Sequence, residues 1–464
     1  MDPAYQSCLF FLERLGQEVV RLKCGPFPGH HTGPQKWLEF VLGAVDTAKG
    51  YLEKSTDSSV SKSEKEKLVT DAEMLSGTAY YLLSFVAGSD AKNIPQQVVA
   101  PFRRWVESLK IINTIFFRAE HFSNYEITTI DPAFLSSIPF PSNSYTEALN
   151  AICWPVQLIT VPSQSMAILP HFAVVAHELG HSIQDQIEPD FNNISTAESN
   201  FYARVGDRLK KAGLTFDTKV QLRCTQIADN WVNEFKADAV GYILVGPAFF
   251  FALSSFLELI GSGYGVAPTH PPSDLRLNKL LKALESGGNG NFNEIFFKHS
   301  KTRLSLKLTC PNLALCPSVD DLYNELKDQH GIVDAAICAE LIAFFDEAAH
   351  PIFVAAEEYI EQIAPEIVYK ASQYELDIER HLELLLMLVP PIEFLEGDKI
   401  KPSGMAAILN IGWFALLTKI DQMPSVKISK GQNPTAQKVE RLHELLLKAV
   451  ELSEARRIWE EHSS

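Results

Sequence analysis

The residues His177-Glu178-Leu179-Gly180-His181 form an HExxH motif near the middle of the 464-residue chain. On an α-helix, residues four positions apart project from the same face about 6 Å apart along the axis, so both imidazoles can reach one metal ion. Glu178 is turned about 100° to the side, where it can act as a general base. The preceding residues 172–176 are apolar, which favours a buried helix. The motif therefore predicts a zinc site beside a catalytic carboxylate.

A catalytic zinc ion needs a third protein ligand, because such sites use three and keep a fourth position for water. The candidate is Glu234, on a helix predicted from about Gln221 through Asp238. Asp238 lies at i+4 on the same face, so it can accept a hydrogen bond from a liganding imidazole and fix its tautomer. A surface acid paired with a lysine is the alternative interpretation of Glu234. The metzincin pattern is excluded, because its Gly and His would fall at Gln184 and Ile187.

The elements that must position these residues are mostly helical, because apolar residues recur at helical spacing along most of the chain. Residues 125–169 are instead rich in proline, serine and β-branched residues, and 156–161 form the strongest predicted strand. We expect a mainly α protein with a small β-sheet, an α+β chain in which helical regions flank a zincin-like catalytic core. The predicted helices span 36–53, 68–86, 98–117, 171–184, 221–238, 275–284, 319–326, 333–347, 352–361, 378–388, 406–420 and 436–452.

Composition and charge restrict the partners and the location of the chain. The hydrophobic content of 46% and the charged content of 21% are typical of a globular protein. The net charge of −16 predicts no nucleic-acid partner, because like charges repel. Seven cysteines without a CxxC pair favour free thiols in a reducing compartment. The first 23 residues lack the basic start and long apolar run of a signal peptide, so we expect a cytoplasmic protein.

One stretch raises the question of a membrane span. Residues 239–256 contain no charge over 18 positions, which is the threshold length for crossing a bilayer. Gly246-Pro247 interrupts this stretch in its middle, and no basic cluster flanks it. We therefore expect a buried helix or helix pair, with a membrane span as the less favoured alternative.

An HExxH motif followed by ExxxD is the signature of the gluzincins. The sequence resembles the family of CAAX-prenyl endopeptidases and heat-shock-type membrane proteases with their soluble relatives. The resemblance covers about residues 145–280 and leaves both flanks unassigned. The matching pieces are Asn150-Ala151 with Pro155 ahead of the predicted strand, Val174 to His181, Glu234 to Asp238, and Thr269-His270-Pro271 with Arg276.

The resemblance implies one zinc ion per chain. Carried over residue by residue, it makes His177, His181 and Glu234 the zinc ligands and Glu178 the general base. Asp238 would accept a hydrogen bond from the ring nitrogen of a liganding imidazole that does not bind the metal. These roles agree with the chemistry expected from the motif spacing alone.

The resemblance also implies residues that hold the substrate. Asn150, His270 and Arg276 would bind the peptide backbone and the oxyanion. Typical membrane members of the family carry several clear spans, and this chain offers only the interrupted stretch at 239–256. The GxMEN box of the zinc aminopeptidases is absent, which favours an endopeptidase.

We expect a zinc metallopeptidase that acts on a peptide or protein substrate and hydrolyses it with a water activated by Glu178. The expected regions are an N-terminal helical region (1–124), a metallopeptidase core (125–290) and a C-terminal helical region (291–464). Two alternatives remain open: a zinc-binding regulatory or scaffold protein with an unused peptidase centre, and an integral membrane metalloprotease.

Overall fold

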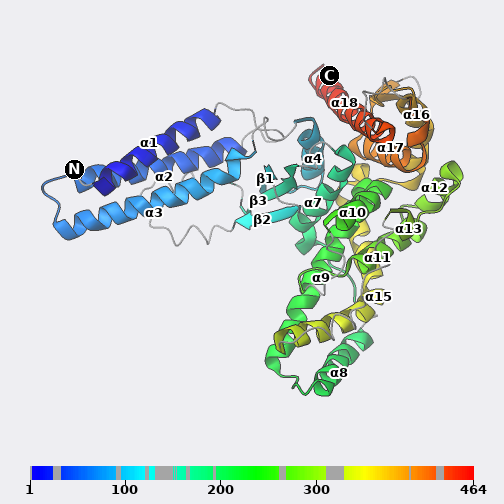
Figure 1. The fold of residues 1–464 in the computed structure, drawn as a ribbon, viewed down its shortest axis with the longest axis horizontal. Coiled ribbons are helices and arrows are strands. Elements are labelled where there is room, and N and C mark those ends of the chain that lie inside the picture. Colours follow the sequence, from blue (N-terminus) through cyan, green and yellow to red (C-terminus); the bar gives the residue numbers. More distant parts are fainter. Residues whose placement is uncertain are drawn as a thin grey trace. The chain divides into compact units, whose positions relative to one another are not determined.

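The computed structural model describes the greater part of the chain, and helices dominate it (Figure 1). Contacts divide the chain into two compact units, residues 1–104 with 110–166 and residues 105–109 with 167–464. The mainly α, α+β class is confirmed. The described residues are 3–23, 33–89, 96–120, 125–130, 150, 152, 154–163, 168–191, 195–260, 268–309, 329–396, 399–424 and 433–463.

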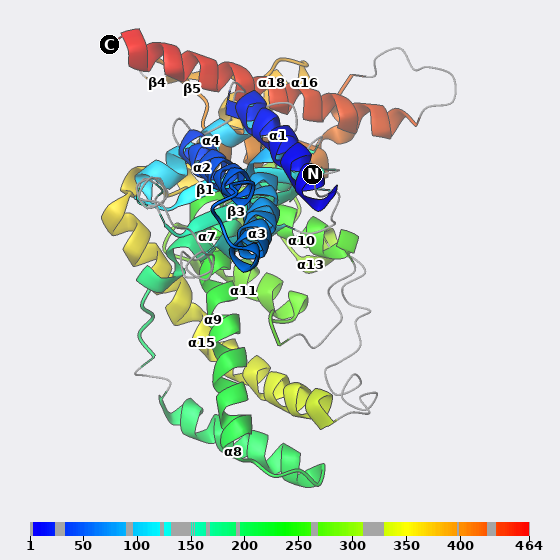
Figure 2. The same ribbon diagram turned by 90° about the vertical axis from the view of Figure 1, so that its left-hand side faces the viewer.

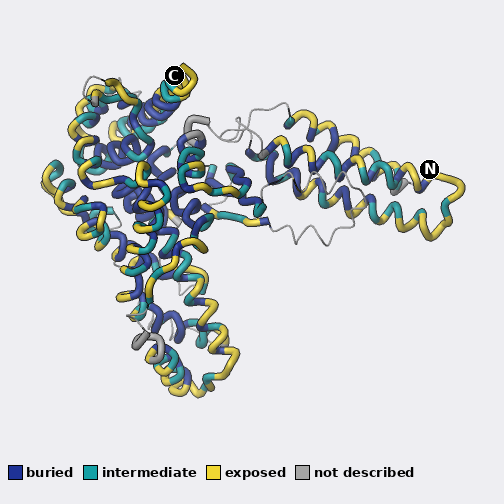
Figure 3. The backbone as a smooth tube through the Cα atoms, turned by 180° about the vertical axis from the view of Figure 1, so that it is seen from behind, coloured by how far each residue is buried: buried dark blue, intermediate teal, exposed yellow. Residues whose placement is uncertain are grey.

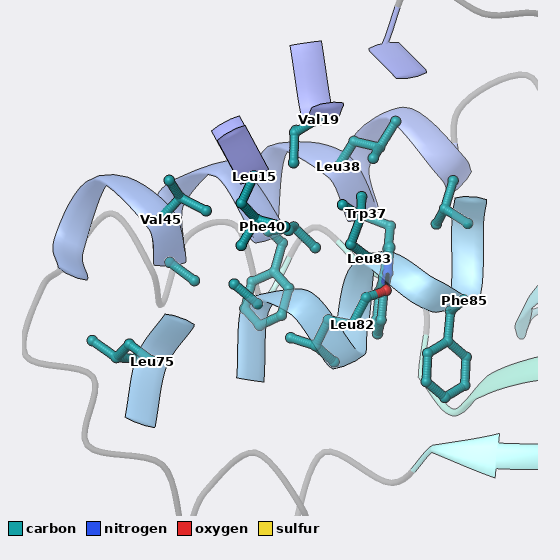
Figure 4. Close-up of a cluster of buried hydrophobic side chains, with 14 of the residues drawn as sticks. Leu15, Val19, Trp37, Leu38, Phe40, Val45, Leu75, Leu82, Leu83 and Phe85 are labelled. Carbon is teal, nitrogen blue, oxygen red and sulfur yellow. Dashed lines mark hydrogen bonds between the residues drawn. The ribbon is translucent and has the colours of Figure 1, made fainter. Parts of the chain in front are cut away.

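The N-terminal unit begins with three long helices that share one apolar core (Figure 4). In α1 the buried residues recur at intervals of four and three, which gives the helix one continuous apolar face. The same spacing continues in the other two helices, and buried and exposed residues alternate along all three (Figure 3). Trp37 lies at the centre and donates from Nε1 to the carbonyl of Leu82 at 2.9 Å. The helices are α1 (Pro3–Lys23), α2 (Gly33–Ser55) and α3 (Lys62–Ala87).

A three-stranded sheet completes the described part of this unit. β3 (Val156–Pro162) lies in the middle, parallel to β1 (Thr114–Glu120) and antiparallel to β2 (Glu126–Ile130). The predicted strand at 156–161 is confirmed. The predicted helix at 98–117 is wrong over its last residues: α4 (Gln96–Ser108) ends early, and the β-branched and aromatic residues 114–117 belong to β1.

The second unit is built around one long helix, α9 (Thr218–Val245), which contacts α7, α10, α11, α15 and α17. Asp217 caps its start by accepting hydrogen bonds from the backbone N–H groups of Lys219 and Val220. The neighbouring elements are η2 (Leu169–Val174), α7 (Val175–Ile183), α8 (Ser195–Lys211), α10 (Pro247–Ile260), α11 (Ser273–Ser286), α12 (Phe292–Ser300), α13 (Leu306–Thr309) and α15 (Gln329–Ile363).

The C-terminal part of this unit packs α16 (Ala371–Leu386), α17 (Met405–Thr418) and α18 (Pro434–Ser463) beside a two-stranded hairpin. The hairpin strands are β4 (Glu393–Glu396) and β5 (Lys399–Pro402). The helices predicted at 378–388, 406–420 and 436–452 are confirmed, although α16 begins seven residues earlier and α18 ends eleven residues later than predicted. The helix predicted at 319–326 lies outside the described residues.

Two helix predictions in the second unit need correction. The polar residues 185–217 predict a connection rather than a helix, but this segment contains α8, which packs beside α15 (Figure 2). The helices predicted at 333–347 and 352–361 form the single helix α15, which continues through Pro351. The strand β3 and the HExxH helix fall in different compact units, and the division into three functional regions stays a prediction.

The uncharged stretch at 239–256 forms the expected buried helix pair. Gly246 separates α9 from α10 with a positive φ of 64°, a conformation that glycine adopts without strain. The side chain of Asn410 binds both sides of this break, donating to the Val245 carbonyl and accepting from the Ala248 N–H. None of the helices in the described ranges combines the length and the hydropathy that crossing a membrane requires.

Candidate metal centre

The HExxH motif lies on α7, which packs closely against α9 (Figure 1). A Cβ added at Gly180 would come within 2.6 Å of the Cα of Ala237. Only glycine at this position lets the two backbones approach so closely. The close approach brings the two histidines of α7 to the face of α9 that carries Glu234.

The three predicted zinc ligands converge. The Nε2 atoms of His177 and His181 are 3.2 Å apart, and each lies 3.5 Å from a carboxylate oxygen of Glu234. One ligand atom from each of the three residues lies within 4.8 Å of the other two. His177 and Glu234 are buried, and His181 is partly exposed. Two imidazoles and one carboxylate form a donor set typical of catalytic zinc sites.

The surroundings of Glu234 test whether these residues fit a metal ion. Its Oε2 atom is buried and has no hydrogen-bond partner among the described residues, although Arg276 Nη1 forms an ion pair with it at 3.1 Å. A buried carboxylate oxygen without a hydrogen bond is costly unless another ligand satisfies it. A zinc ion between the imidazoles and this carboxylate would satisfy it, so the residues fit the group.

Asp238 supports the first imidazole, as predicted. Its Oδ1 lies 3.0 Å from His177 Nδ1, and Arg276 donates to both of its oxygens at 2.8 and 2.7 Å. Burial favours the neutral acid, but the charge and the hydrogen bonds of Arg276 hold the pKa of Asp238 at about 2. An ionised Asp238 keeps the proton of His177 on Nδ1, so that Nε2 presents its lone pair to the metal position.

Glu178, the predicted general base, is buried on α7 next to the first ligand. Burial raises the pKa of its carboxyl, and the nearby imidazoles and Arg276 oppose the rise. A raised pKa brings a carboxylate closer to the range in which it can take and return a proton at neutral pH. The role of general base stays a prediction.

The three predicted substrate-binding residues have different surroundings. The His270 side chain is 54% exposed, and its Nε2 lies 3.5 Å from Glu234 Oε1, at the open side of the centre. Arg276 is buried, and its guanidinium is engaged by Asp238 and Glu234, which favours a positioning role over binding an oxyanion. Asn150 is an exposed residue of the N-terminal unit, and its contact with substrate stays a prediction.

Two residues around the ligands were not predicted. Gln184 Oε1 lies 2.9 Å from His181 Nδ1, so the amide oxygen can accept from this imidazole as Asp238 does from the other. Its position three residues after His181, at the C-terminal cap of α7, could have revealed it. The ring of Phe249 stacks on His177 with centroids 6.3 Å apart. No local signal predicts this contact, since Phe249 is one of several apolar residues of α10.

Helix α17 contacts both segments that lead to the predicted ligands. Trp413 Nε1 donates to the carbonyl of Pro170 at 3.0 Å, just ahead of α7. Asn410, fully buried, ties the end of α9 to the start of α10. Residues 410–413 are all buried, and their hydrogen bonds fix the chain just before α7 and just after α9.

A second group of possible ligand atoms belongs to His299, Glu375 and Glu379. The ammonium group of Lys298 already forms ion pairs with both carboxylates. This group is therefore adequately explained as a surface charge network, and the centre on α7 and α9 is the stronger metal candidate.

Comparisons with protein-family models, with curated proteins and with solved structures found no match for this chain. The motif residues and the geometry of the centre are therefore the basis for a functional proposal.

Proposed function

We propose that this protein is a zinc metallopeptidase of the gluzincin type, resembling the CAAX-prenyl endopeptidase and heat-shock protease family. One observation carries the proposal: the ligand atoms of His177, His181 and Glu234 lie within 4.8 Å of one another, and the buried Oε2 of Glu234 has no hydrogen-bond partner among the residues that the structure describes. The neighbouring Glu178 supplies the base that hydrolysis needs and that a purely structural zinc site does not.

The residues of the centre divide the work of peptide hydrolysis. When bound, zinc supplies a nucleophile at neutral pH and polarises the scissile carbonyl. Glu178 takes the proton of the attacking water and later returns it to the leaving amine. Arg276 and Asp238 hold His177 in the tautomer that binds metal. His270, at the open side of the centre, is the residue best placed to donate a hydrogen bond to the developing oxyanion.

We also place the protein in the cytoplasm. The described cysteines, Cys8, Cys224 and Cys338, are buried free thiols, which suits a reducing compartment. Cell fractionation tests this proposal. Recovery in a membrane pellet that resists high-salt and carbonate washes would favour the alternative of an integral membrane metalloprotease.

The decisive experiment compares the intact protein with Glu178→Gln. We expect about one zinc per chain by elemental analysis in both proteins. Cleavage of a mixed peptide library should fall by about 10² or more in the variant, because the shape of the side chain is kept and the base is lost. Glu188→Gln, in the exposed segment after α7, is the matched control and should cleave normally. Zinc binding without turnover in the intact protein would support the alternative of a regulatory or scaffold protein.

The metal assignment has its own test. His177→Ala and Glu234→Ala should each lose most of the zinc, because two protein ligands hold the ion far less firmly than three. His330→Ala, on the exposed start of α15, is the control. Full zinc occupancy in both ligand variants would show that the ion is bound elsewhere.

A further inference from the structure

A groove of about 390 Å³ lies between α11 and α15, one helical turn behind the metal centre. Tyr242 forms part of its lining, four residues after Asp238 on α9. Lys279, three residues after Arg276 on α11, lines it as well. None of the residues assigned to metal binding or hydrolysis lines this groove, so it is a separate site with a volume typical of pockets for small ligands.

One end of the groove is positively charged. The ammonium groups of Lys279 and Lys282 share the single carboxylate of Asp346, which leaves one positive charge in excess. The side chains of Lys282 and Asp346 are 65% and 66% exposed. The exposed Lys282–Asp346 pair contributes little to stability, so a ligand carboxylate can bind Lys282 at small cost. Lys279 is only 6% exposed and also donates to the carbonyl of Asp346, so its positive charge is fixed beside this position.

The other end of the groove is negatively charged. Glu357 accepts a hydrogen bond from the backbone N–H of Gly288, and a Cβ on this glycine would meet Glu357 Oε1 at 2.4 Å. Among the residues that the structure describes, Glu357 takes part in no ion pair. Burial raises the pKa of its carboxyl, and the charge of Glu361 adds to the rise. A positively charged ligand group would therefore be favoured at this end.

The middle of the groove is apolar, with Ala349, Phe353 and Val354 of α15 facing Ala283 of α11. Asp346 and Glu357 are eleven positions apart on α15, which corresponds to about 16 Å along the helix. An extended peptide of four residues spans about 13 Å. The groove thus matches a ligand with a carboxylate at one end, an ammonium at the other and apolar side chains between.

We propose that this groove binds short peptides that have free termini, with the terminal ammonium at Glu357 and the terminal carboxylate at Lys279 and Lys282. A free amino acid is too short to reach both charged ends, and a blocked peptide lacks the charges. Binding here does not require turnover at the metal centre, so this proposal and the peptidase proposal fail separately.

The test is calorimetric titration of Ala-Leu-Leu-Ala into the full-length, zinc-loaded Glu178→Gln protein, which keeps the probe from being cleaved. Acetylating the N-terminus or amidating the C-terminus should each weaken binding about tenfold or more, because each removes a charged hydrogen-bonding group. Glu357→Gln and Lys282→Ala should have similar effects. The controls, Glu358→Gln and Lys210→Ala, change exposed residues outside the groove and should bind like the parent protein.

Free and blocked peptides that bind equally well, or no binding at all, would overturn the proposal. So would unchanged affinity in both Glu357→Gln and Lys282→Ala. A repeat in His177→Ala separates the two sites, because groove binding should survive the loss of zinc. Binding that is lost in His177→Ala and unchanged in Glu357→Gln would place the peptide at the metal centre instead, which would support the peptidase proposal and contradict this one.

Discussion

Two buried aspartates of the second unit differ in the partners that surround them. Asp238 and Asp377 are both 0% exposed, and each lies on a long helix. Asp238 receives two hydrogen bonds from the guanidinium of Arg276, and its pKa is about 2. Asp377 receives hydrogen bonds from the Tyr369 hydroxyl and the Gln373 amide, both at 2.8 Å, and burial raises its pKa to about 6.

The difference shows that burial alone does not decide whether a carboxylate carries charge. A full positive charge offsets the cost of burying Asp238, whereas neutral donors offset only part of the cost for Asp377. A zinc ion at the proposed centre would need a charged Asp238, because only the ionised form holds the proton of His177 on the nitrogen away from the metal position. Asp377 has no such task, and its partners suit a residue that links α16 to the segment before it.

The largest expected effect on stability comes from removing the positive charge beside Asp238. Arg276→Leu leaves Asp238 and Glu234 without their compensating charge, so the free energy of unfolding of the zinc-depleted protein should fall by about 3–5 kcal/mol. Zinc should restore part of the loss, because its charge replaces some of the missing compensation. Urea denaturation with a chelator and with added zinc measures both effects.

Arg276→Lys is the control that keeps the positive charge but loses the shape of the guanidinium. The ammonium group keeps the charge but cannot reproduce the paired hydrogen bonds of the guanidinium, so the loss should be smaller than for leucine. If both variants lose less than about 1 kcal/mol, the ion pair is not what makes the burial of Asp238 tolerable.

An intermediate effect on stability is expected from removing the titratable group of Asp377. The folded-state pKa of Asp377, about 6, lies above the ordinary value of 3.8, so the folded state binds more protons between these two values. Stability from this group is therefore present below pH 3.8 and is lost as the pH rises through 6. Asp377→Asn stays neutral, so it should gain about 1–3 kcal/mol relative to the intact protein between pH 4.5 and 7. Equal stability differences at both pH values would contradict the shift.

The sequence relates the candidate metal ligands to one another but not the residues around Asp377, for a physical reason. His177 and His181 share one helix face, as do Glu234 and Asp238, so helical spacing alone relates the members of each pair. Asp377 lies in an amphipathic helix, where an acidic residue is ordinarily assigned to the solvent face. Only the packing of the preceding segment shows that its side chain is buried.

Long-range contacts account for most of what sequence reasoning missed. Asn410 bonds to Val245, which lies 165 residues earlier, and no local pattern encodes such a contact. Arg276 pairs with Asp238 across 38 residues of sequence. The sequence did not predict this ion pair, because the resemblance assigned Arg276 to substrate binding. The helix α8 was missed because residues 195–211 are strongly polar, and polar segments without a clear apolar face are usually assigned to connections.

The smallest expected effect on stability concerns the surroundings of Asp377, where two buried tyrosines can be compared as a matched pair. Tyr369 donates its hydroxyl proton to Asp377, whereas the hydroxyl of Tyr374 is buried without a hydrogen-bond partner among the described residues. Tyr369→Phe should therefore destabilise the protein by about 1 kcal/mol at neutral pH, since a carboxylate loses one of its two side-chain donors. Tyr374→Phe should be neutral or slightly stabilising, because it removes an unsatisfied buried hydroxyl.

The two phenylalanine variants also predict different pH profiles. Loss of the Tyr369 hydrogen bond should raise the pKa of Asp377 further and move the pH-dependent loss of stability upward, because the hydrogen bond favours the charged carboxylate. Tyr374→Phe should leave the profile in place. Thermal unfolding from pH 4.5 to 8 measures both curves. Equal profiles for the two variants would mean that the Tyr369 hydroxyl does not stabilise the Asp377 carboxylate, and the contrast with Asp238 would then depend on the charge of Arg276 alone.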